Sequence, residues 1–219
     1  DIDFLICHST YYGFLASFVG VDYSITPQGS EVLIRPFKSN FYKFIIVRAS
    51  EKAKFVTVDS VLMYEKLSEI SNCKIHIIQN GIDIDSINDV VHKNNGIKRE
   101  DILSIRGITP LYQTHRLLNC LPDDLNIKLC FPFHDENYLR EIIKDFPNHN
   151  YLYRLSHAEL YDLLCSTSIV FSTPLSDSSP RSVYEAIFLG CYVFTTYHKF
   201  IDELPVCMKE RIVEIRLCL

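Results

Sequence analysis

Asp177 and Glu185 are two carboxylates eight residues apart, and they are the strongest candidates in this sequence for ligand-binding or catalytic residues. Asp177 follows an apolar run at 168–172 that is rich in β-branched residues and predicts a buried strand. Pro180 stands at the expected first position of a helix, with Ser179 as its N-cap. Because such a helix N-terminus offers unpaired N–H groups, we interpret the segment as a site for a phosphorylated ligand.

The helix expected over 180–190 carries apolar side chains on nearly every side, which predicts that it is mostly buried. A carboxylate in the middle of a buried helix, as at Glu185, is costly unless it is paired or hydrogen-bonded. The alternative for Glu185 is a capping box with Ser182, because Ser-x-x-Glu is that motif. The alternative for Asp177 is a loop residue that caps neighbouring N–H groups. The residues alone leave these alternatives open.

The elements that must position these side chains are alternating strands and helices. Strands are predicted at 4–7, 23–26, 55–58, 74–78, 102–105, 128–131, 151–153, 168–172 and 191–196. Helices are predicted at 11–19, 39–49, 61–70, 114–120, 136–144, 157–165 and 180–190. The segment 85–99 is rich in Asn, Asp and Lys and is the best linker candidate. We therefore predict two parallel-sheet α/β domains, residues 1–95 and 96–219.

Ligands of parallel α/β folds bind at the carboxyl ends of strands. Three segments fall there in the predicted order of elements: 28–31, 106–107 and 176–182. With two domains, the expected place for a substrate is the cleft between them. For Arg106 alone, an interdomain salt bridge is the competing interpretation.

The composition excludes several classes of protein. The chain has 219 residues, 47% of them hydrophobic, and a net charge of −5, which argues against a nucleic-acid-binding surface. The longest apolar run, 11–21, is shorter than the roughly 20 residues that a bilayer span needs, and we identify no signal peptide. Four basic residues at 35–48 are interpreted as a solvated helix face, with a peripheral membrane-facing patch as the alternative: Arg35, Lys38, Lys43 and Arg48.

Cysteine and histidine usage predicts a cytoplasmic protein without a metal site. The eight cysteines form no C-x-x-C pair and are interpreted as buried reduced thiols. The eight histidines show no metal-binding spacing. Because the chain begins two residues before an apolar strand and stops in the apolar run 211–219, we also expect a fragment or a shortened gene product.

Several ordered motifs resemble the retaining nucleotide-sugar glycosyltransferases of family 4, which have the GT-B fold of two Rossmann-like domains facing a cleft. The strand FVTVDS ends in a serine, and KIHIIQNGID is similar to the family's strand followed by Asn-Gly, a hydrophobic residue and Asp. The segments 102–106 and 157–170 resemble the arginine-bearing strand and the helix before the donor loop. Asp177 to Glu185 fits the acid-x7-acid motif. The resemblance covers nearly the whole chain but implies an incomplete N-terminal domain.

The resemblance implies roles for the candidate residues. Glu185 would hydrogen-bond the ribose of the nucleotide, and Asp177 would hold hydroxyls of the donor sugar. The backbone N–H groups of Arg181 and Ser182 would meet the diphosphate. Arg106 would neutralise the phosphate charge that grows as the leaving group departs, a need that a helix N-terminus also serves.

Two further donor-side residues follow from the resemblance, together with three departures from it. Arg154, in a strand-end segment that would face the base, and Gly29 are assigned to donor binding. The family pairs its arginine with a lysine about five residues on, whereas this chain has Pro-Leu-Tyr-Gln at 110–113. Gln28 and Glu31 stand where the family often has histidine and aspartate. The first acid is Asp177 rather than glutamate.

The function implied is a hexosyltransferase-type glycosyltransferase in envelope polysaccharide biosynthesis. It would move a sugar from a nucleoside-diphosphate sugar to a glycan or lipid-linked glycan with retention, in the cytoplasm or at the inner face of the membrane. The donor is a substrate, and no cofactor or metal is predicted. The alternatives are an inactive sugar-nucleotide-binding remnant and a nucleotide-sugar epimerase. A dinucleotide oxidoreductase is disfavoured because no G-x-G-x-x-G follows a strand.

Overall fold

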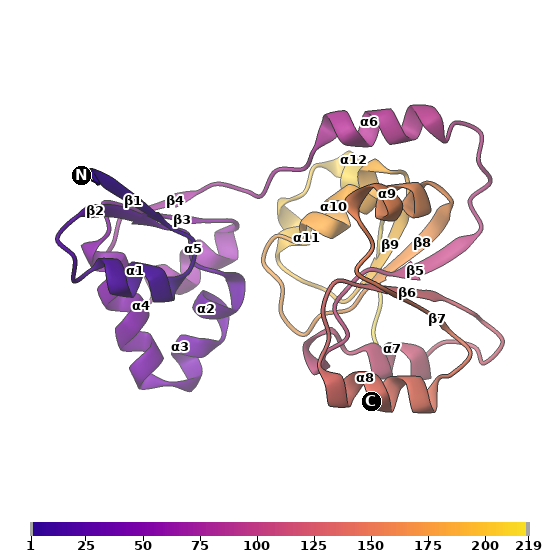
Figure 1. Ribbon diagram of the computed structural model, residues 1–219, viewed down its shortest axis with the longest axis horizontal. Helices are drawn as coiled ribbons and strands as arrows, with labels where there is room; N and C mark the ends of the chain where they lie inside the picture. Colours follow the sequence, from indigo (N-terminus) through magenta and orange to yellow (C-terminus); the bar gives the residue numbers. More distant parts are fainter. Residues whose placement is uncertain (1, 218–219) are drawn as a thin grey trace. The chain divides into compact units, whose positions relative to one another are not determined.

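The computed structural model describes residues 2–217 and divides into two compact units. Unit 1 comprises the residues up to Asn80 together with Ser176–Ser179 and His198–Asp202, and unit 2 comprises the rest. Each unit has a parallel sheet with helices, which confirms the predicted α/β class (Figure 1). Residues 81–95, which the sequence placed in the first domain, fall in unit 2.

Unit 1 has a parallel sheet whose strands follow chain order, β1-β2-β3-β4. The strands are β1 (Phe4–Cys7), β2 (Asp22–Ile25), β3 (Phe55–Val58) and β4 (Ile75–Ile77). The connecting helices are α1 (Thr10–Ala16), α2 (Gly29–Leu33), α3 (Arg35–Lys38), α4 (Asn40–Lys52) and α5 (Val61–Ser68). Because right-handed crossovers between successive neighbours all lie on the same side, these helices cover one face of the sheet (Figure 1).

The core of unit 1 lies between that face and the helices. It includes Ile25, Ile46, Val56 and Leu67, all of them fully buried. On the opposite face of the sheet, Phe4 and Phe55 stack with ring centroids 6.2 Å apart and stay 41% and 37% exposed. The sheet of unit 1 is therefore packed on one side only among the described residues.

Unit 2 has a six-stranded parallel sheet of order β10-β9-β8-β5-β6-β7. Its strands are β5 (Asp101–Ser104), β6 (Lys128–Phe131), β7 (Asn150–Tyr153), β8 (Thr167–Ser172), β9 (Tyr192–Thr195) and β10 (Ile212–Glu214). Its helices are α6 (Ile84–Lys93), the 3-10 turn η1 (Pro110–Tyr112), α7 (Thr114–Asn119), α8 (Glu136–Asp145), α9 (His157–Cys165), α10 (Arg181–Phe188) and α12 (Val206–Lys209). The remaining helix, α11 (Phe200–Glu203), falls mostly in unit 1 by residue number.

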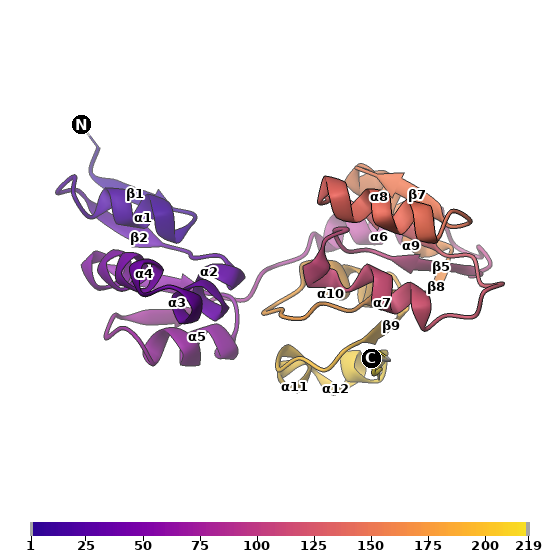
Figure 2. The same cartoon turned by 90° about the horizontal axis from the view of Figure 1, so that it is seen from below.

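The sheet of unit 2 is covered on both faces. Helices α7 and α8 lie on one side and α9 and α10 on the other (Figures 1 and 2). The chain runs outward from β5 through β6 to β7, and then returns to the other side of β5 with β8. This reversal is the topological switch point at which open α/β sheets bind ligands.

The expected linker at 85–99 was wrong for most of its length, because residues 84–93 form helix α6. The Asp83 side chain caps the helix by accepting from the N–H of Ser86 at 3.0 Å. Ile87 and Val90, three residues apart, are buried, and the Asn94 amide donates to Asp162 of α9 at 2.9 Å. The segment is polar in composition, but its few apolar residues recur at helical spacing. This narrow apolar stripe is enough to pack a helix against the rest of the unit.

Helix α10 begins one residue later than predicted, with Pro180 rather than Ser179 in the N-cap position. Its predicted end is confirmed, because Gly190 follows it with a positive φ of 90°. The N–H of Gly190 donates to Ile187 and that of Cys191 to Ala186, which is a Schellman motif. This cap turns the chain directly into β9 and so fixes where α10 lies on the sheet.

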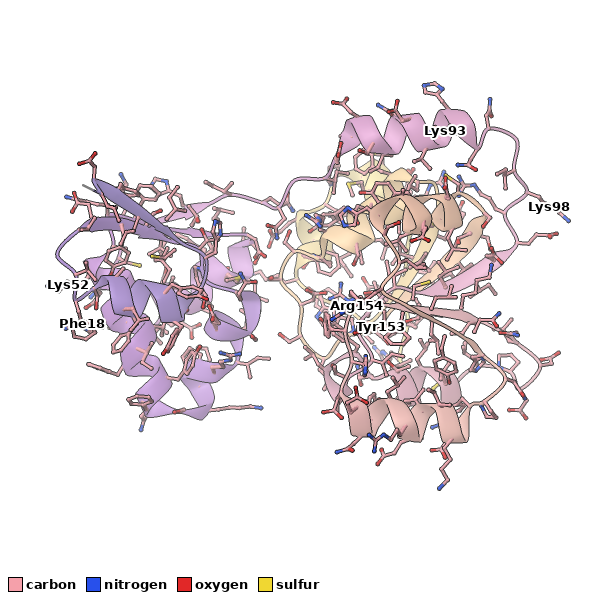
Figure 3. The ribbon with its side chains drawn as sticks, viewed as in Figure 1. Phe18, Lys52, Lys93, Lys98, Tyr153 and Arg154 are labelled. Atoms are coloured by element: carbon pink, nitrogen blue, oxygen red, sulfur yellow. The ribbon has the colours of Figure 1, made fainter. Side chains whose placement is uncertain are left out.

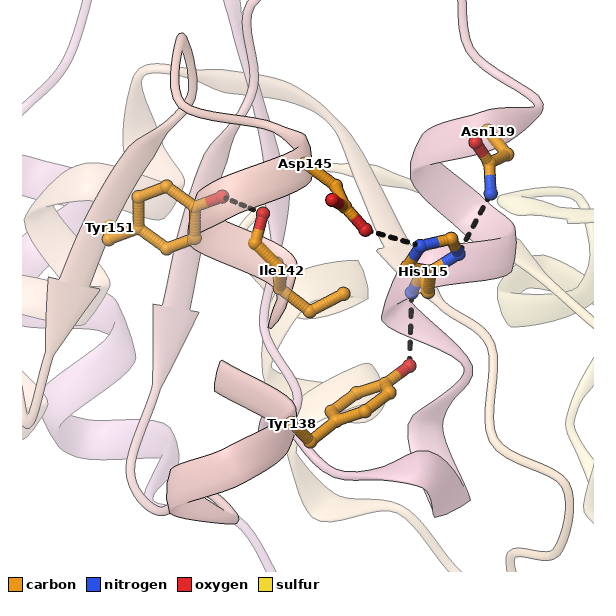
Figure 4. A network of polar contacts seen from close by, with 6 residues as sticks. All are labelled: His115, Asn119, Tyr138, Ile142, Asp145 and Tyr151. Carbon is orange, nitrogen blue, oxygen red and sulfur yellow. Dashed lines mark hydrogen bonds and ion pairs between the residues drawn. The ribbon is translucent and has the colours of Figure 1, made fainter. Parts of the chain in front are cut away.

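Polar contacts also join α7 to α8 on the other face (Figure 4). The hydroxyl of Tyr138 accepts from the backbone N–H of His115 at 3.1 Å, and the His115 ring lies 3.1 Å from the Asp145 carboxylate. Asn119 lies 2.8 Å from the second ring nitrogen of His115. These contacts hold the start of α7, which follows the loop that carries Arg106 and Tyr112.

Two further expectations concern thiols and membrane spans. The cysteines among the described residues form no disulfide bonds, and Cys7, Cys130, Cys165 and Cys191 are buried. The expected burial is wrong for the other described cysteines, since Cys73 and Cys120 are half-buried and Cys207 is exposed. Cys218 lies outside the described residues. No helix within residues 2–217 is both long and apolar enough to cross a bilayer.

Candidate functional site

The candidate site of unit 2 is centred on its switch point. Arg106 follows β5 by two residues, and its Nη1 donates to the hydroxyl of Ser182 at 3.1 Å. Ser182 lies in the first turn of α10, which follows β8 across the loop 173–180. The structure thus brings together a guanidinium and a helix N-terminus, the two features that bind phosphate in such folds.

Glu185 lies one turn further into α10 and is buried, with its side chain 6% exposed. Its Oε1 accepts from the hydroxyl of Tyr161 at 3.0 Å and lies 3.3 Å from Nε of Arg181. The capping-box alternative is therefore wrong, because α10 has Pro180 as its N-cap and no capping bond from a side chain. The buried charge is instead paired and hydrogen-bonded within the site.

Tyr161 lies on α9, and no sequence pattern predicts that it contacts Glu185. Burial, and then the Glu185 carboxylate that accepts its hydrogen bond, raise the pKa of Tyr161 to about 12. The phenol therefore stays protonated at neutral pH and keeps donating to Glu185. Only the packing of α9 beside α10 on one face of the sheet could reveal this contact.

The loop after Arg106 has no lysine and instead places an aromatic ring against the arginine. The guanidinium of Arg106 lies 4.7 Å from the centre of the Tyr112 ring, in cation–π geometry. Leu111, about where the lysine is expected, accepts through its carbonyl from the N–H of Leu175 at 2.7 Å. The loop is thereby tied to the segment that leads into α10, and Tyr112 orients the arginine.

Arg154 lies at the carboxyl end of β7 with a left-handed φ of 53°, an uncommon conformation for a residue with a side chain. Its guanidinium stacks on the Tyr153 ring at 5.0 Å (Figure 3). His134 and Phe131 pack against the same ring, with centroids 5.0 and 5.3 Å away. Tyr153 is 45% exposed, so the strand end offers an aromatic face next to a cation.

Gly29 and Asp177, the other two predicted site residues, belong to unit 1. Asp177 accepts from the N–H of Ser178 at 3.0 Å, which is the local capping role named as its alternative. A Cβ at Gly29 would lie 3.1 Å from the Ser178 hydroxyl, so a side chain there would be tight. The structure thus groups Arg106, Arg181, Ser182 and Glu185 at one place, with Arg154 elsewhere in unit 2.

Asp59, directly after strand β3, is a half-buried acid for which the sequence predicts no role. Its Oδ2 accepts from the Ser178 hydroxyl and from the Asn80 amide, each at 3.1 Å. Burial raises the pKa of Asp59, and the charge of Asp177 adds to that effect. Its Oδ1 is buried without a hydrogen-bond partner among the described residues.

Glu31, which stands where the family often has aspartate, is an organising residue of unit 1. Its carboxylate accepts from the Ser9 hydroxyl at 2.7 Å and from the N–H groups of Thr10 and Gln28 at 2.8 and 2.9 Å. Burial alone would raise its pKa, but these hydrogen bonds outweigh burial and hold the pKa of Glu31 below its usual value.

Replacing Glu31 by glutamine is expected to lower the free energy of unfolding by about 1–3 kcal/mol at neutral pH, because buried donors lose their acceptor. A carboxylate whose pKa is lowered by folding stabilises above its unfolded pKa, and this stabilisation is lost as the pH falls through the folded pKa. The difference between the wild type and Glu31→Gln should therefore be full at neutral pH and shrink in acid. Urea titrations at a series of pH values measure it, and a difference that does not change with pH would contradict this role.

Unit 2 also contains a pocket of about 770 Å³ beside the ends of β9 and β10. Its lining includes Gln113 and Arg116 of the α7 region and residues 214–217. Arg116 donates to Gln113 at 2.7 Å and to the Leu217 carbonyl at 3.3 Å. The predicted site residues are not part of this lining, so the geometry of Arg106 and Glu185, rather than the hollow, defines the candidate site. Within residues 2–217, no group of three or more His, Cys, Asp or Glu side chains could hold a metal ion.

Comparison with protein-family models and with curated proteins finds no match for this sequence. Solved structures do match. HepE from Anabaena, in complex with UDP and glucose, is 16% identical with a TM-score of 0.71 over 92% of this chain and 61% of its own. Sucrose-phosphate synthase from Thermosynechococcus elongatus is 12% identical with a TM-score of 0.71, over 91% and 58% of the two chains.

A third similar structure is the pneumococcal O-GlcNAc transferase GtfA in complex with UDP and GlcNAc. It is 15% identical with a TM-score of 0.66, over 90% of this chain and 43% of its own. The chain has the two-sheet α/β fold of GT-B glycosyltransferases and spans about three fifths of the length of HepE. At these identities, the likeness establishes the fold.

Proposed function

We propose that this chain binds a nucleoside-diphosphate sugar in unit 2 and belongs to a glycosyltransferase that transfers the sugar with retention. The observation that carries the proposal is the contact of Arg106 with Ser182 at the switch point, one turn before the buried Glu185. Similar structures with this fold contain UDP, which supports a nucleotide as the ligand.

The diphosphate would lie against the N-terminus of α10. Backbone N–H groups at Arg181 and Ser182 face the end where the helix dipole is positive, and Arg106 adds a full positive charge held by Tyr112. When the bond to the sugar breaks, negative charge grows on the departing diphosphate. Donors and a cation fixed in advance stabilise that charge without reorganising, which is the main way such sites accelerate a reaction.

Glu185 would recognise the ribose. Tyr161 and Arg181 both contact Oε1, and we assign Oε2 to the ribose hydroxyls. A buried carboxylate held on one oxygen is a strong, oriented acceptor, because hydrogen bonds to charged groups are the strong ones. Tyr153, with Arg154 stacked on it, is the aromatic face that the base would meet.

Asp177 is proposed to hold hydroxyls of a hexosyl group, and Gly29 to permit close approach on the donor side; both proposals rest on the resemblance. The acceptor is proposed to be a glycan or lipid-linked glycan in envelope polysaccharide assembly, without a metal or other cofactor. The second candidate is an inactive sugar-nucleotide-binding remnant. It is favoured by Leu111 at the place of the family's lysine.

The test is calorimetric titration with UDP, GDP, UDP-glucose and GDP-mannose, followed by analysis of each mixture for transfer, hydrolysis and epimerisation. The proposal expects one nucleoside diphosphate to bind at least about tenfold more tightly than the other, since a site with oriented polar groups rejects a ligand that leaves them unpaired. Binding with transfer or hydrolysis supports the enzyme, and binding without turnover supports the remnant. A free epimerised sugar would assign the site to an epimerase, and failure of both nucleotides to bind would contradict the donor site.

A further inference from the structure

Unit 1 carries exposed aromatic and basic side chains on α1, on the turn that follows it, and on α3 and α4. The apolar side chains among them are large and well exposed: Phe41 by 70%, Phe18 by 62%, Phe44 by 56%, Phe37 by 51% and Leu15 by 48%. Exposed lysines accompany them on α3 and α4: Lys38, Lys43 and Lys52. We call these eight residues the basic–aromatic surface. Phe18 and Lys52 are labelled in Figure 3.

The aromatic side chains of α1 and α4 form one continuous patch. Phe41, Phe44 and Arg48 follow one another at helical spacing on the same side of α4. Phe14 of α1 bridges the two helices, with its ring 5.2 Å from Phe18 and 6.2 Å from Phe44. The guanidinium of Arg48 lies 4.3 Å over the Phe18 ring. The apolar rings are thus held in place while their outer faces stay in solvent.

The helices α3 and α4 carry a net positive charge, whereas the whole chain is negative. The chain has a net charge of −5. Residues 35–52 nevertheless contain a single acid, Glu51, against five basic residues: Arg35, Lys38, Lys43, Arg48 and Lys52. Such a concentration of one sign beside exposed rings suits a partner that is anionic and also accepts apolar side chains.

We propose that the basic–aromatic surface binds the surface of an anionic lipid bilayer. Aromatic side chains partition into the boundary between head groups and acyl chains, and lysine and arginine are attracted to anionic head groups. A second copy of this chain fits less well, because a two-fold contact would set the two basic patches against each other. The proposal concerns unit 1 and does not depend on donor binding in unit 2.

The test is cosedimentation with vesicles of phosphatidylcholine alone and of phosphatidylcholine mixed with phosphatidylglycerol. The wild type should sediment with the mixed vesicles, more weakly as salt is added, and far less with the neutral ones. The variant Lys38→Gln/Lys43→Gln/Lys52→Gln should bind the anionic vesicles roughly a hundredfold more weakly, since each lysine contributes about fivefold. The variant Phe41→Ser/Phe44→Ser should lose at least about tenfold.

Matched controls come from unit 2, where Lys93→Gln/Lys98→Gln/Lys144→Gln removes the same number of exposed charges. Val206→Ser removes a side chain that is 73% exposed. Both controls should bind the vesicles as the wild type does, and circular dichroism should show that every variant is folded. Equal binding to neutral and anionic vesicles would overturn the proposal, as would equal losses in the controls. A wild type that fails to sediment with anionic vesicles would also overturn it. So would a Phe41→Ser/Phe44→Ser variant that still binds vesicles but no longer self-associates, because the surface would then be a contact between copies of this chain.

Discussion

The Arg106→Ala variant is expected to bind the nucleoside diphosphate about tenfold to a hundredfold more weakly than the wild type. The guanidinium is placed to make a charge-assisted hydrogen bond to phosphate, an interaction worth about 1.5–3 kcal/mol. If the chain is active, the loss in transfer rate should be larger, about a hundredfold or more, because the charge on the diphosphate grows in the transition state.

Titration with the free nucleoside tests whether Arg106 acts on the phosphates. The nucleoside lacks the diphosphate, so Arg106→Ala and the wild type should bind it with the same affinity. Arg106→Lys should lie between the two, because it keeps the charge but loses the planar stacking on Tyr112. Arg140, on α8 with its side chain 76% exposed, provides the control variant Arg140→Ala. If Arg106→Ala weakens nucleoside and nucleoside diphosphate equally, the arginine does not act on phosphate.

The Glu185→Gln variant is expected to lose recognition of the ribose, the second large effect. The wild type should bind the nucleoside diphosphate about tenfold more tightly than its 2′,3′-dideoxy analogue, because the analogue leaves the carboxylate without donors. In Glu185→Gln this preference should nearly vanish. Calorimetric titration of both ligands into both proteins gives the coupling free energy directly.

Glutamine is chosen because it keeps the volume of the side chain and an oxygen that can accept from Tyr161. Alanine would instead leave the Tyr161 hydroxyl buried without an acceptor, and about 1–3 kcal/mol of stability would be lost with it. Glu141, exposed on α8, gives the control Glu141→Gln. An equal preference for ribose in wild type and Glu185→Gln would remove Glu185 from the ribose site while leaving the phosphate assignment to Arg106 untouched.

Much of the fold could be predicted from the sequence because local patterns determine it. The runs at 128–131 and 157–165 were predicted at the bounds that the structure shows, since short β-rich and amphipathic segments carry their own signals. Helix α6 was missed because its apolar stripe is narrow and its composition is polar. Helices α2 and α3 were missed because a four- or five-residue helix has almost no period to read.

The candidate site also has a part that could be predicted from the sequence and a part that could not. Sequence spacing brought Arg181, Ser182 and Glu185 together, because residues one turn apart on a helix are neighbours. The partner Tyr161 could not be predicted, because its contact with Glu185 joins residues 24 positions apart. The contact of Tyr112 with Arg106 depends on the turn η1 between them, which is too short to have a period to read. Asp59 was hidden for the same reason as Tyr161, since its contact with Ser178 joins residues 119 positions apart.

The sequence by itself determined that this chain alternates strands and helices in two parallel sheets and that an acid sits inside the helix after β8. The hydrophobic period and the turn residues carry that information locally. Only the tertiary structure decided what the acid does. Strand order places α9 beside α10 and β5 beside β8, and this order gives Glu185 its Tyr161 partner and sets Arg106 against Ser182. Those contacts arise from the reversal of strand order, which local sequence patterns do not encode.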